Sequence, residues 1–288
     1  MLKPLLKSMR PHQWYKNFVI FVGILFSLNL SNPNAWINTL SAFLIFCVLS
    51  GSVYITNDII DREKDRMHPV KRNRPIASGQ LKFSHAIIFA IIFIIASITG
   101  AFILNSAFGF ISVSYFLLIL FYSIYLKNII IVDLLTISIG FVIRAIAGCL
   151  AIKVIVSPWL ILCAFLLALF LALGKRRHEL ILLGDDASMH RKILEGYSIN
   201  MLEQMTNITT SALIASYSIY TFYTNSYYMM LTIPFAIYGL FRYLHLVHIK
   251  NFGGEPEMIF KDKPTLINLM LWGLLVVLIL YIPIGAIQ

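Results

Sequence analysis

Long apolar stretches separated by short polar segments run along the whole chain. Nine of them are long enough to cross a bilayer, at about 16–31, 36–56, 83–104, 107–126, 130–152, 158–174, 205–224, 227–249 and 265–286. Turn signals such as Asn32-Pro33, Ser157-Pro158 and Lys263-Pro264 stand at several of their ends. The pattern predicts an all-α integral membrane protein, with nine transmembrane helices forming a single domain over residues 1–288. Only two connections, about 57–82 and about 175–204, are long enough to build a site.

Composition agrees with the hydrophobic pattern. Of 288 residues, 59% are hydrophobic and 12% are charged, whereas a soluble domain carries about twice that charged fraction. Cys47, Cys149 and Cys163 lie in apolar runs without metal-ligand spacing, which indicates small core residues rather than a disulfide framework. We expect a membrane environment and no nucleic-acid partner.

The basic residues predict the orientation. With nine spans, twenty of the Lys and Arg residues fall on one side of the membrane, and the connections on the other side hold only Lys153. Lys and Arg concentrate in cytoplasmic loops. The sequence therefore predicts a protein of the cell (inner) membrane with its N-terminus cytoplasmic, its C-terminus outside and its site on the cytoplasmic face.

Acidic side chains gather where the second predicted span ends. Asn57, Asp58, Asp61 and Asp65 follow one another there, and at 100° per residue the three aspartates fall within about 60° on a helix. Carboxylates on one stripe repel unless a cation lies between them, and oxygen donors suit a hard divalent ion. This pattern predicts a Mg²⁺ site; the alternative is a solvated helix end with mixed charges.

A basic segment follows these acids. His68-Pro69 is expected to end the helix, after which Lys71, Arg72 and Arg74 can fold back over phosphate oxygens. The alternative is that the positive-inside rule alone places these bases here. Acids facing bases favour a site for a metal-chelated diphosphate.

A second polar cluster follows the sixth predicted span. Lys175, Arg176 and Arg177 come first, and Glu179 lies one turn beyond Lys175, a spacing that predicts a pair orienting the lysine or closing a second metal site. The alternative is an interfacial helix whose long basic side chains reach for the headgroups. The roles of Asp185 and Asp186, just beyond, stay open.

Other candidate residues are scattered. Lys16 and Asn17 precede the first span, where an interface anchor is the alternative to a substrate role. Tyr122 and Lys127 end the fourth span. Arg144 lies inside the fifth, where a buried arginine either binds an anion or closes an internal ion pair.

These motifs resemble a known family. The nine spans with Asn57, Asp58, Asp61 and Asp65 after the second resemble the UbiA-type prenyltransferase superfamily over essentially the whole chain. The segments RPHQWYKN, HPVKRNRPIASG, FVIRAIAG, LALGKRRHEL and HRKILEGY resemble more narrowly its decaprenyl-phosphate phosphoribosyltransferase branch. Most superfamily members carry a second DxxxD motif after the sixth span, and this chain has Lys175, Arg176 and Arg177 there instead.

The resemblance implies transfer of 5-phosphoribose from 5-phosphoribosyl diphosphate (PRPP) to a decaprenyl-like polyprenyl phosphate, with release of diphosphate, for lipid-linked pentose and cell-envelope glycan synthesis. It implies Mg²⁺ bound through Asn57, Asp58, Asp61 and Asp65, with Asp58, Asp61 and Lys175 as catalytic residues. Expected substrate-binding residues are Lys16, Asn17, Lys71, Arg72, Arg74, Tyr122, Lys127, Arg144, Arg176 and Glu179. The family resemblance also suggests homo-oligomers, trimers among them.

Two alternatives differ in testable ways. A UbiA-type enzyme that moves a prenyl group from its diphosphate to an aromatic acceptor predicts the second acidic motif that is missing here. A non-enzymatic lipid transporter or scaffold predicts charges lining a path through the spans, where only Arg144 and Arg242 are candidates. The central prediction is a cage in which the acids after the second span face cations from both cytosolic connections.

Overall fold

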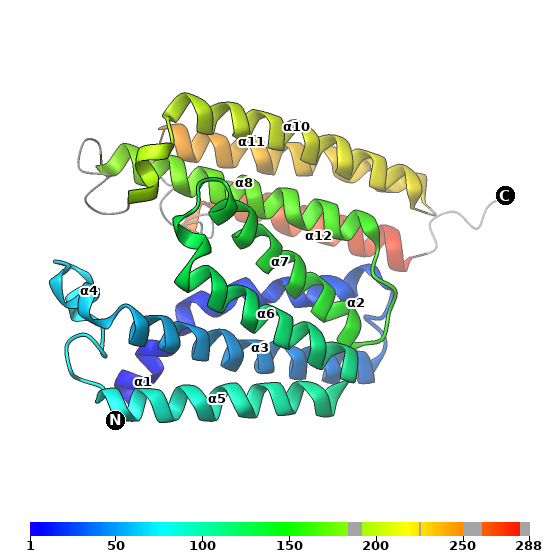
Figure 1. The fold of residues 1–288 in the computed structure, drawn as a ribbon. Helices are drawn as coiled ribbons and strands as arrows, with labels where there is room; N and C mark the ends of the chain where they lie inside the picture. The colour runs from blue at the N-terminus through cyan, green and yellow to red at the C-terminus, as the bar shows by residue number, and fades with distance from the viewer. Residues whose placement is uncertain (184–191, 225, 250–260, 283–288) are drawn as a thin grey trace. The chain divides into compact units, whose positions relative to one another are not determined.

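The computed structural model describes residues 1–183, 192–224, 226–249 and 261–282, and the regular elements in these ranges are helices (Figure 1). The chain forms two compact units, one of Met1–Tyr125 with Ile143–Val156 and the other of Leu126–Val142 with Ser157–Gln288. Helix α7 (Val132–Ala151) contributes its first part to the second unit and its last part to the first. The expectation of a single domain stays a prediction.

The first unit is built around one long helix. Its elements are α1 (Leu2–Met9), the 3₁₀ helix η1 (Pro11–Phe21), α2 (Val22–Phe26), α3 (Pro33–Ile60), α4 (Arg62–Met67), the 3₁₀ helix η2 (Lys71–Asn73), α5 (Phe83–Leu104) and α6 (Ser106–Ile124). Helix α3 packs against α1, η1, α5 and α6, and α5 packs against α6 (Figure 1). Helix α3 begins after Asn32, whose side chain caps it by accepting hydrogen bonds from the amides of Asn34 and Ala35.

An apolar cluster fills the centre of this unit. Phe46 of α3, Phe108 of α6 and Ile20 of η1 are fully buried in it, together with Ala147 from the end of α7. Helix α5 instead exposes side chains such as Ile95 and Ile103. Exposed apolar surface of this kind suits a helix in contact with lipid.

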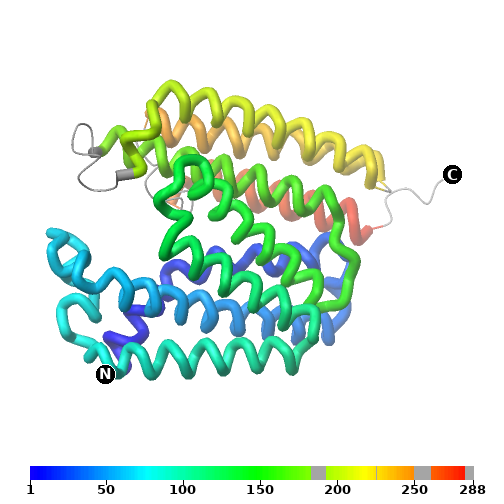
Figure 2. The backbone as a smooth tube through the Cα atoms, viewed as in Figure 1, coloured from blue at the N-terminus to red at the C-terminus, as the bar shows by residue number. Residues whose placement is uncertain are grey.

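The second unit packs four long helices. Its elements are the 3₁₀ helix η3 (Leu126–Asn128), α8 (Pro158–Leu183), the 3₁₀ helix η5 (Lys192–Gly196), α10 (Ile199–Tyr223), the 3₁₀ helix η6 (Tyr227–Thr232), α11 (Ile233–Ile249) and α12 (Lys263–Tyr281). Helix α8 packs against α10 and α11, and α11 packs against α10 and α12 (Figure 2). Buried Leu173, Leu202 and Leu134 form one core of this unit, and Phe170 with Tyr243 belongs to another.

An ion pair joins α11 to the start of α12. Asp262 caps α12 by accepting hydrogen bonds from the amide and hydroxyl of Thr265, and Arg242 of α11 donates to both of its carboxylate oxygens at 3.0 and 2.9 Å. These bonds, that from Arg242 above all, hold the pKa of Asp262 well below its usual range. Arg242 therefore serves as an internal ion-pair partner, not as part of a charged path.

Seven helices of the described residues are long and apolar enough to cross a bilayer. They are Pro33–Ile60, Phe83–Leu104, Ser106–Ile124, Val132–Ala151, Pro158–Leu182, Tyr227–Ile249 and Lys263–Tyr281. The expected span at 205–224 coincides with α10 up to Tyr223, and this helix is less apolar because it carries several Thr, Ser, Asn and Tyr residues. The expectation of nine spans, and of their orientation, stays a prediction.

The expected first span, 16–31, is not one continuous α-helix. It is replaced by the eleven residues of η1 and the five of α2, which end at Phe26. A 3₁₀ helix rises about 2.0 Å per residue against about 1.5 Å for an α-helix, so these two elements together reach about 30 Å. That length is close to the thickness of the hydrocarbon core of a bilayer, although these elements have no more residues than the expected span.

A close approach of backbones holds η1 and α2 against the end of α7. Gly148 of α7 lies against the backbone carbonyl of Ile20, and Gly23 lies against the backbone of Gly148 and Cys149. A Cβ atom at position 148 would overlap the carbonyl oxygen of Ile20. Asn17 and Ile20 follow the three-residue spacing that aligns side chains along one edge of the 3₁₀ helix η1, and Gly23 lies in α2 directly after it.

We expect Gly148→Ala to lower stability by about 1–3 kcal/mol, because the added methyl forces two packed backbones apart. The matched control is Gly273→Ala on α12, where an added Cβ meets no atom within 4 Å and higher helix propensity favours alanine. Thermal unfolding in detergent compares the two variants. Equal melting temperatures would contradict the close contact.

Candidate active site

Two buried carboxylates lie where α3 runs into α4. Asp58 is on the last turn of α3 and Asp65 is in α4, with exposures of only 2% and 3%. The amide of Asp61 bonds to the carbonyl of Asn57 (2.9 Å), and the amide of Asp65 bonds to that of Asp61 (2.8 Å). These bonds keep an almost helical path through the junction, which brings Asp58 and Asp65 to the same side as the sequence predicted.

Arginine side chains hold these two acids together. Nη1 of Arg74, just after η2, lies 3.1 Å from Oδ1 of Asp58 and 2.6 Å from Oδ2 of Asp65. Nη2 of Arg10, at the end of α1, lies 2.6 Å from the same Asp58 oxygen. The carboxylate oxygens therefore converge on a positively charged nitrogen. Arg10 belongs to the RPHQWYKN motif, but nothing in the sequence predicts it as a partner of Asp58.

The other predicted residues of this segment lie around the pair. Asn57 and Asp61 are half-buried, and Asp61 has further polar or electrostatic contacts. Lys71 is half-buried and also has such contacts, whereas Arg72 is exposed. The basic segment thus does not act as one block: Arg74 is brought onto the acids and Arg72 faces outward.

The donor set fits a divalent ion that shares its coordination with phosphate. Among the described residues, no three His, Cys, Asp or Glu side chains are close enough to hold a metal by themselves. Mg²⁺ usually takes one or two protein carboxylates and fills its other positions with water and substrate phosphates. Two buried carboxylates converging on one cationic atom match that requirement, with amide and carboxylate oxygens of Asn57 and Asp61 on the same segment.

A second polar group of this unit is buried inside the helices. Arg144 of α7 donates from Nε to Oδ1 of Asn17 (2.9 Å) and from Nη2 to the hydroxyl of Tyr115 (2.6 Å), and its guanidinium lies 4.7 Å from that ring. Asn17 donates in turn to Ser50 and Cys47. Asn17 and Arg144 were predicted separately, and the structure brings them together. Tyr115 was missed, because nothing in its apolar segment distinguishes it.

In the second unit, one buried acid organises the polar residues. Asp133, fully buried at the start of α7, lies 2.5 Å from Nη2 of Arg176 and accepts a 2.7 Å hydrogen bond from the hydroxyl of Tyr197. That hydroxyl also accepts from the amide of Ile131 (2.7 Å). Burial, followed by this bond to Asp133, raises the pKa of Tyr197 well above its usual range. The phenol therefore stays protonated as a donor.

The basic run after Gly174 divides between two directions. Arg176 bonds to Asp133 and to Glu179 (2.5 Å), whereas Arg177 bonds to Glu203 of α10 at 2.8 Å. Adjacent helix positions differ by about 100°, so neighbouring arginines contact different elements. The sequence predicted that Glu179 pairs with Lys175; in the structure Glu179 pairs with Arg176 instead. Lys175 is exposed.

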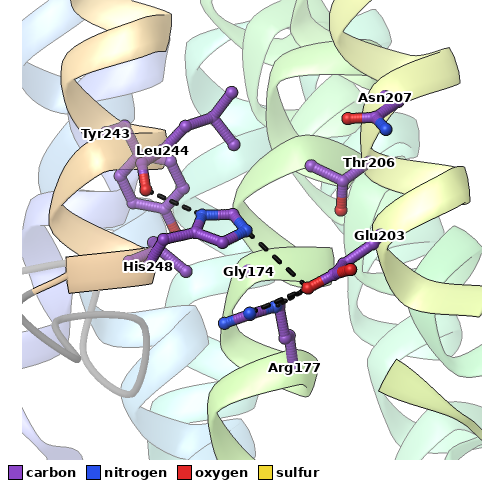
Figure 3. A pocket seen from close by; sticks show the side chains of 9 residues that line it. Gly174, Arg177, Glu203, Thr206, Asn207, Tyr243, Leu244 and His248 are labelled. Atoms are coloured by element: carbon purple, nitrogen blue, oxygen red, sulfur yellow. Dashed lines mark hydrogen bonds and ion pairs between the residues drawn. The ribbon is translucent and has the colours of Figure 1, made fainter. Parts of the chain in front are cut away.

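Arg177 and its partner Glu203 line a small cavity. It has a volume of about 190 Å³ and is lined from α8, α10 and α11 by residues that include Gly174, Arg177, Glu203, Tyr243 and His248. Figure 3 shows Arg177 and His248 both directed at the Glu203 carboxylate, with His248 Nε2 3.9 Å away from it. The buried hydroxyl of Tyr243 finds no hydrogen-bond partner among the described residues.

Three further predicted residues have contacts of their own. Lys16 is half-buried, with its ammonium 5.9 Å from the ring centre of Tyr15. Tyr122, in the first unit, and Lys127, in the second, are half-buried and have polar or electrostatic contacts. Asp185 and Asp186 lie outside the described residues. The expected cage draws residues from both units and stays a prediction.

The arrangement of these elements defines the class: a helical integral membrane protein with ion pairs near its helix ends and a buried polar group around Arg144. The model of the UbiA prenyltransferase family matches residues 17–261, and the chain belongs to this family. That confirms the resemblance drawn from its motifs.

Named relatives are similar over nearly the full length. The decaprenyl-phosphate phosphoribosyltransferase of Mycobacterium tuberculosis is 32% identical over 275 residues, which cover 92% of this chain and 90% of the relative. That of Corynebacterium glutamicum is 31% identical, over 96% of this chain and 87% of the relative. A solved UbiA homologue from Archaeoglobus fulgidus bound to DMAPP and Mg²⁺ is similar in fold, with a TM-score of 0.72 and 17% identity, over 96% of this chain and 99% of that one.

We expect Asp133→Asn to lower the free energy of unfolding by about 2–3 kcal/mol, because Arg176 then loses its fully buried counter-ion and keeps only the partly exposed Glu179. Glu203→Gln is the matched control: it breaks the half-exposed pair with Arg177 and should cost less than about 1 kcal/mol. Denaturant or thermal unfolding in detergent measures both. Similar losses in the two variants would contradict the central role of Asp133.

Tyr243→Phe is expected to leave stability unchanged or raise it by about 1 kcal/mol. A buried hydroxyl without a partner carries its desolvation penalty uncompensated, and phenylalanine removes that penalty. The same unfolding measurement checks this. A loss larger than about 1 kcal/mol would indicate that the hydroxyl has a partner in the cavity.

Proposed function

We propose that this protein transfers 5-phosphoribose from PRPP to the phosphate of a decaprenyl-like polyprenyl lipid, releasing diphosphate. The C1–O bond to the leaving diphosphate breaks as a new bond forms from C1 to an oxygen of the lipid phosphate. That oxygen is already anionic near neutral pH, so the reaction requires no strong general base. Catalysis then consists mainly of positioning and electrostatic stabilisation.

One observation above all supports this proposal: the buried carboxylates of Asp58 and Asp65 converge on a single cationic nitrogen, within reach of a second arginine. Convergent acids with cations beside them suit a metal-bound diphosphate. The choice of a ribosyl rather than a prenyl donor rests on the decaprenyl-phosphate phosphoribosyltransferases that are about a third identical over most of the chain. The missing second DxxxD motif points the same way.

The first unit would hold the diphosphate. Asn57, Asp58, Asp61 and Asp65 would bind Mg²⁺, which when bound neutralises the charge that grows on the leaving diphosphate. Asp58 and Asp61 are the catalytic carboxylates of this proposal. Arg74 and its neighbours Lys71 and Arg72 would donate hydrogen bonds to phosphate oxygens, where guanidinium groups bind two oxygens at once.

Other cations would hold the remaining phosphate groups. Lys175 is exposed beside the buried Arg176, so its ammonium can reach a phosphate. Asp133 and Glu179 hold the guanidinium of Arg176 in a fixed orientation. The proposal gives binding roles to Lys16, Asn17, Tyr122, Lys127 and Arg144 as well. The isoprenoid tail would lie against apolar helix surface in the bilayer, with the chemistry on the cytoplasmic face.

We expect Asp58→Asn to lower the rate of transfer on the order of 100-fold or more, because the diphosphate loses metal-assisted stabilisation. Purified protein is incubated with a polyprenyl phosphate and radiolabelled PRPP, and the labelled lipid is measured. Glu63→Gln is the matched control, since this acid is 73% exposed on α4; its rate should stay within about twofold of wild type.

The donor is tested in parallel reactions. Wild-type protein is given either PRPP with the lipid phosphate or a prenyl diphosphate with an aromatic acceptor. Labelled product only in the second reaction would replace ribosyl transfer by prenyl transfer. If neither reaction gives product although the protein still binds the lipid, a transporter or scaffold would be favoured. Wild-type rates for Asp58→Asn would remove the proposed metal role.

A further inference from the structure

The acid pair of the first unit already has a full set of counter-ions. Arg74 bridges Asp58 and Asp65 through one nitrogen, and Arg10 contacts the Asp58 oxygen that Arg74 also contacts. Two carboxylates and two guanidiniums leave the group with no net charge. A divalent ion entering alone would therefore meet two positive groups at the oxygens it needs, and like charges at such distances repel strongly outside bulk water.

Exposure differs between the two kinds of side chain. The carboxylate side chains are 2% and 5% exposed, whereas those of Arg10 and Arg74 are 23% and 26% exposed. A ligand that approaches from solvent thus meets the guanidiniums before the acids. An anion is attracted at that surface, and a free cation is repelled.

We infer that Arg10 and Arg74 act as exchangeable counter-ions, which make the acid pair accept a divalent ion only together with a diphosphate. The carboxylates of Asp58 and Asp65 would then hold the metal ion, and the two released guanidiniums would bind the diphosphate oxygens. The inference rests on the proposed function in assuming a metal–diphosphate ligand, and it is independent of whether ribose or a prenyl group is attached.

Both arginines are placed for such an exchange. The guanidinium of Arg10 lies 4.9 Å from the ring centre of Tyr54, one helical turn before Asp58 on α3, so the aromatic face stabilises its charge when it leaves the carboxylate. Arg74 directly follows η2, and its own backbone is extended, outside any helix. A planar guanidinium binds a carboxylate and a phosphate with the same fork of donors.

Binding of Mn²⁺ by the purified protein, followed by electron paramagnetic resonance, tests the exchange without any turnover. Mn²⁺ prefers the same oxygen ligands as Mg²⁺ and is added alone or with inorganic diphosphate. In wild type we expect diphosphate to tighten Mn²⁺ binding by about 10-fold or more, in the usual range of coupling between ligands. By reciprocity, Mn²⁺ should tighten diphosphate binding by the same factor.

Arg74→Gln should change the two affinities in opposite directions. Mn²⁺ alone should bind about 10-fold more tightly than to wild type, because its competitor is gone, while binding of Mn²⁺ with diphosphate should weaken. Arg10→Gln should act in the same sense. Arg74→Lys keeps the positive charge and should leave binding of Mn²⁺ alone weak. Lys64→Gln, an exposed position on α4, is the control and should match wild type.

The opposite signs separate the possible roles. If Arg74→Gln weakens binding with diphosphate but leaves Mn²⁺ alone unchanged, Arg74 is only a phosphate ligand and the exchange is wrong. If it weakens both in a protein with a wild-type melting temperature, its role is to shape the acid pair, and the exchange is also wrong. The expected Mn²⁺ pattern without any phosphoribosyl transfer would overturn the proposed function and leave the exchange standing.

Discussion

Buried carboxylates paired with arginines are the constraint on which the polar parts of this structure depend. Asp58, Asp133 and Asp262 are each less than a tenth exposed, and each meets at least one guanidinium. An unpaired charge in such surroundings would be strongly destabilising. The partners come from segments distant in sequence, so these pairs fix how helix ends and connections meet within each unit.

Much of this structure could be predicted because lipid imposes simple rules. Runs of apolar residues gave the long helices, since a backbone in hydrocarbon must satisfy its hydrogen bonds internally. The helical period placed Asp58 and Asp65 on one side of the chain, and the structure confirms their convergence. Local spacing was sufficient in both cases, because neighbours along one helix are determined by the period alone.

The rest depends on tertiary contacts that spacing does not encode. Arg10 and Asp58 are 48 positions apart, and Arg144 and Asn17 are 127 apart, so no local pattern pairs them. Lys175 and Arg176 both lie at helical distances that suit a pair with Glu179. The structure pairs Glu179 with Arg176, which is buried beside Asp133. Tyr197 follows a polar segment, and only the structure shows that its hydroxyl donates a hydrogen bond to Asp133.

The 3₁₀ form of η1 has a consequence for how this part of the chain can vary. Its three-residue repeat sets Asn17 and Ile20 in line. Asn17 meets Arg144, and Ile20, together with Gly23 of the following α2, meets the backbone around Gly148. Deleting one residue between them would turn the line by about 120° and separate all of these contacts at once, with hydrophobicity almost unchanged. This segment should therefore accept apolar substitutions at exposed positions such as Phe18 but hardly any change of length.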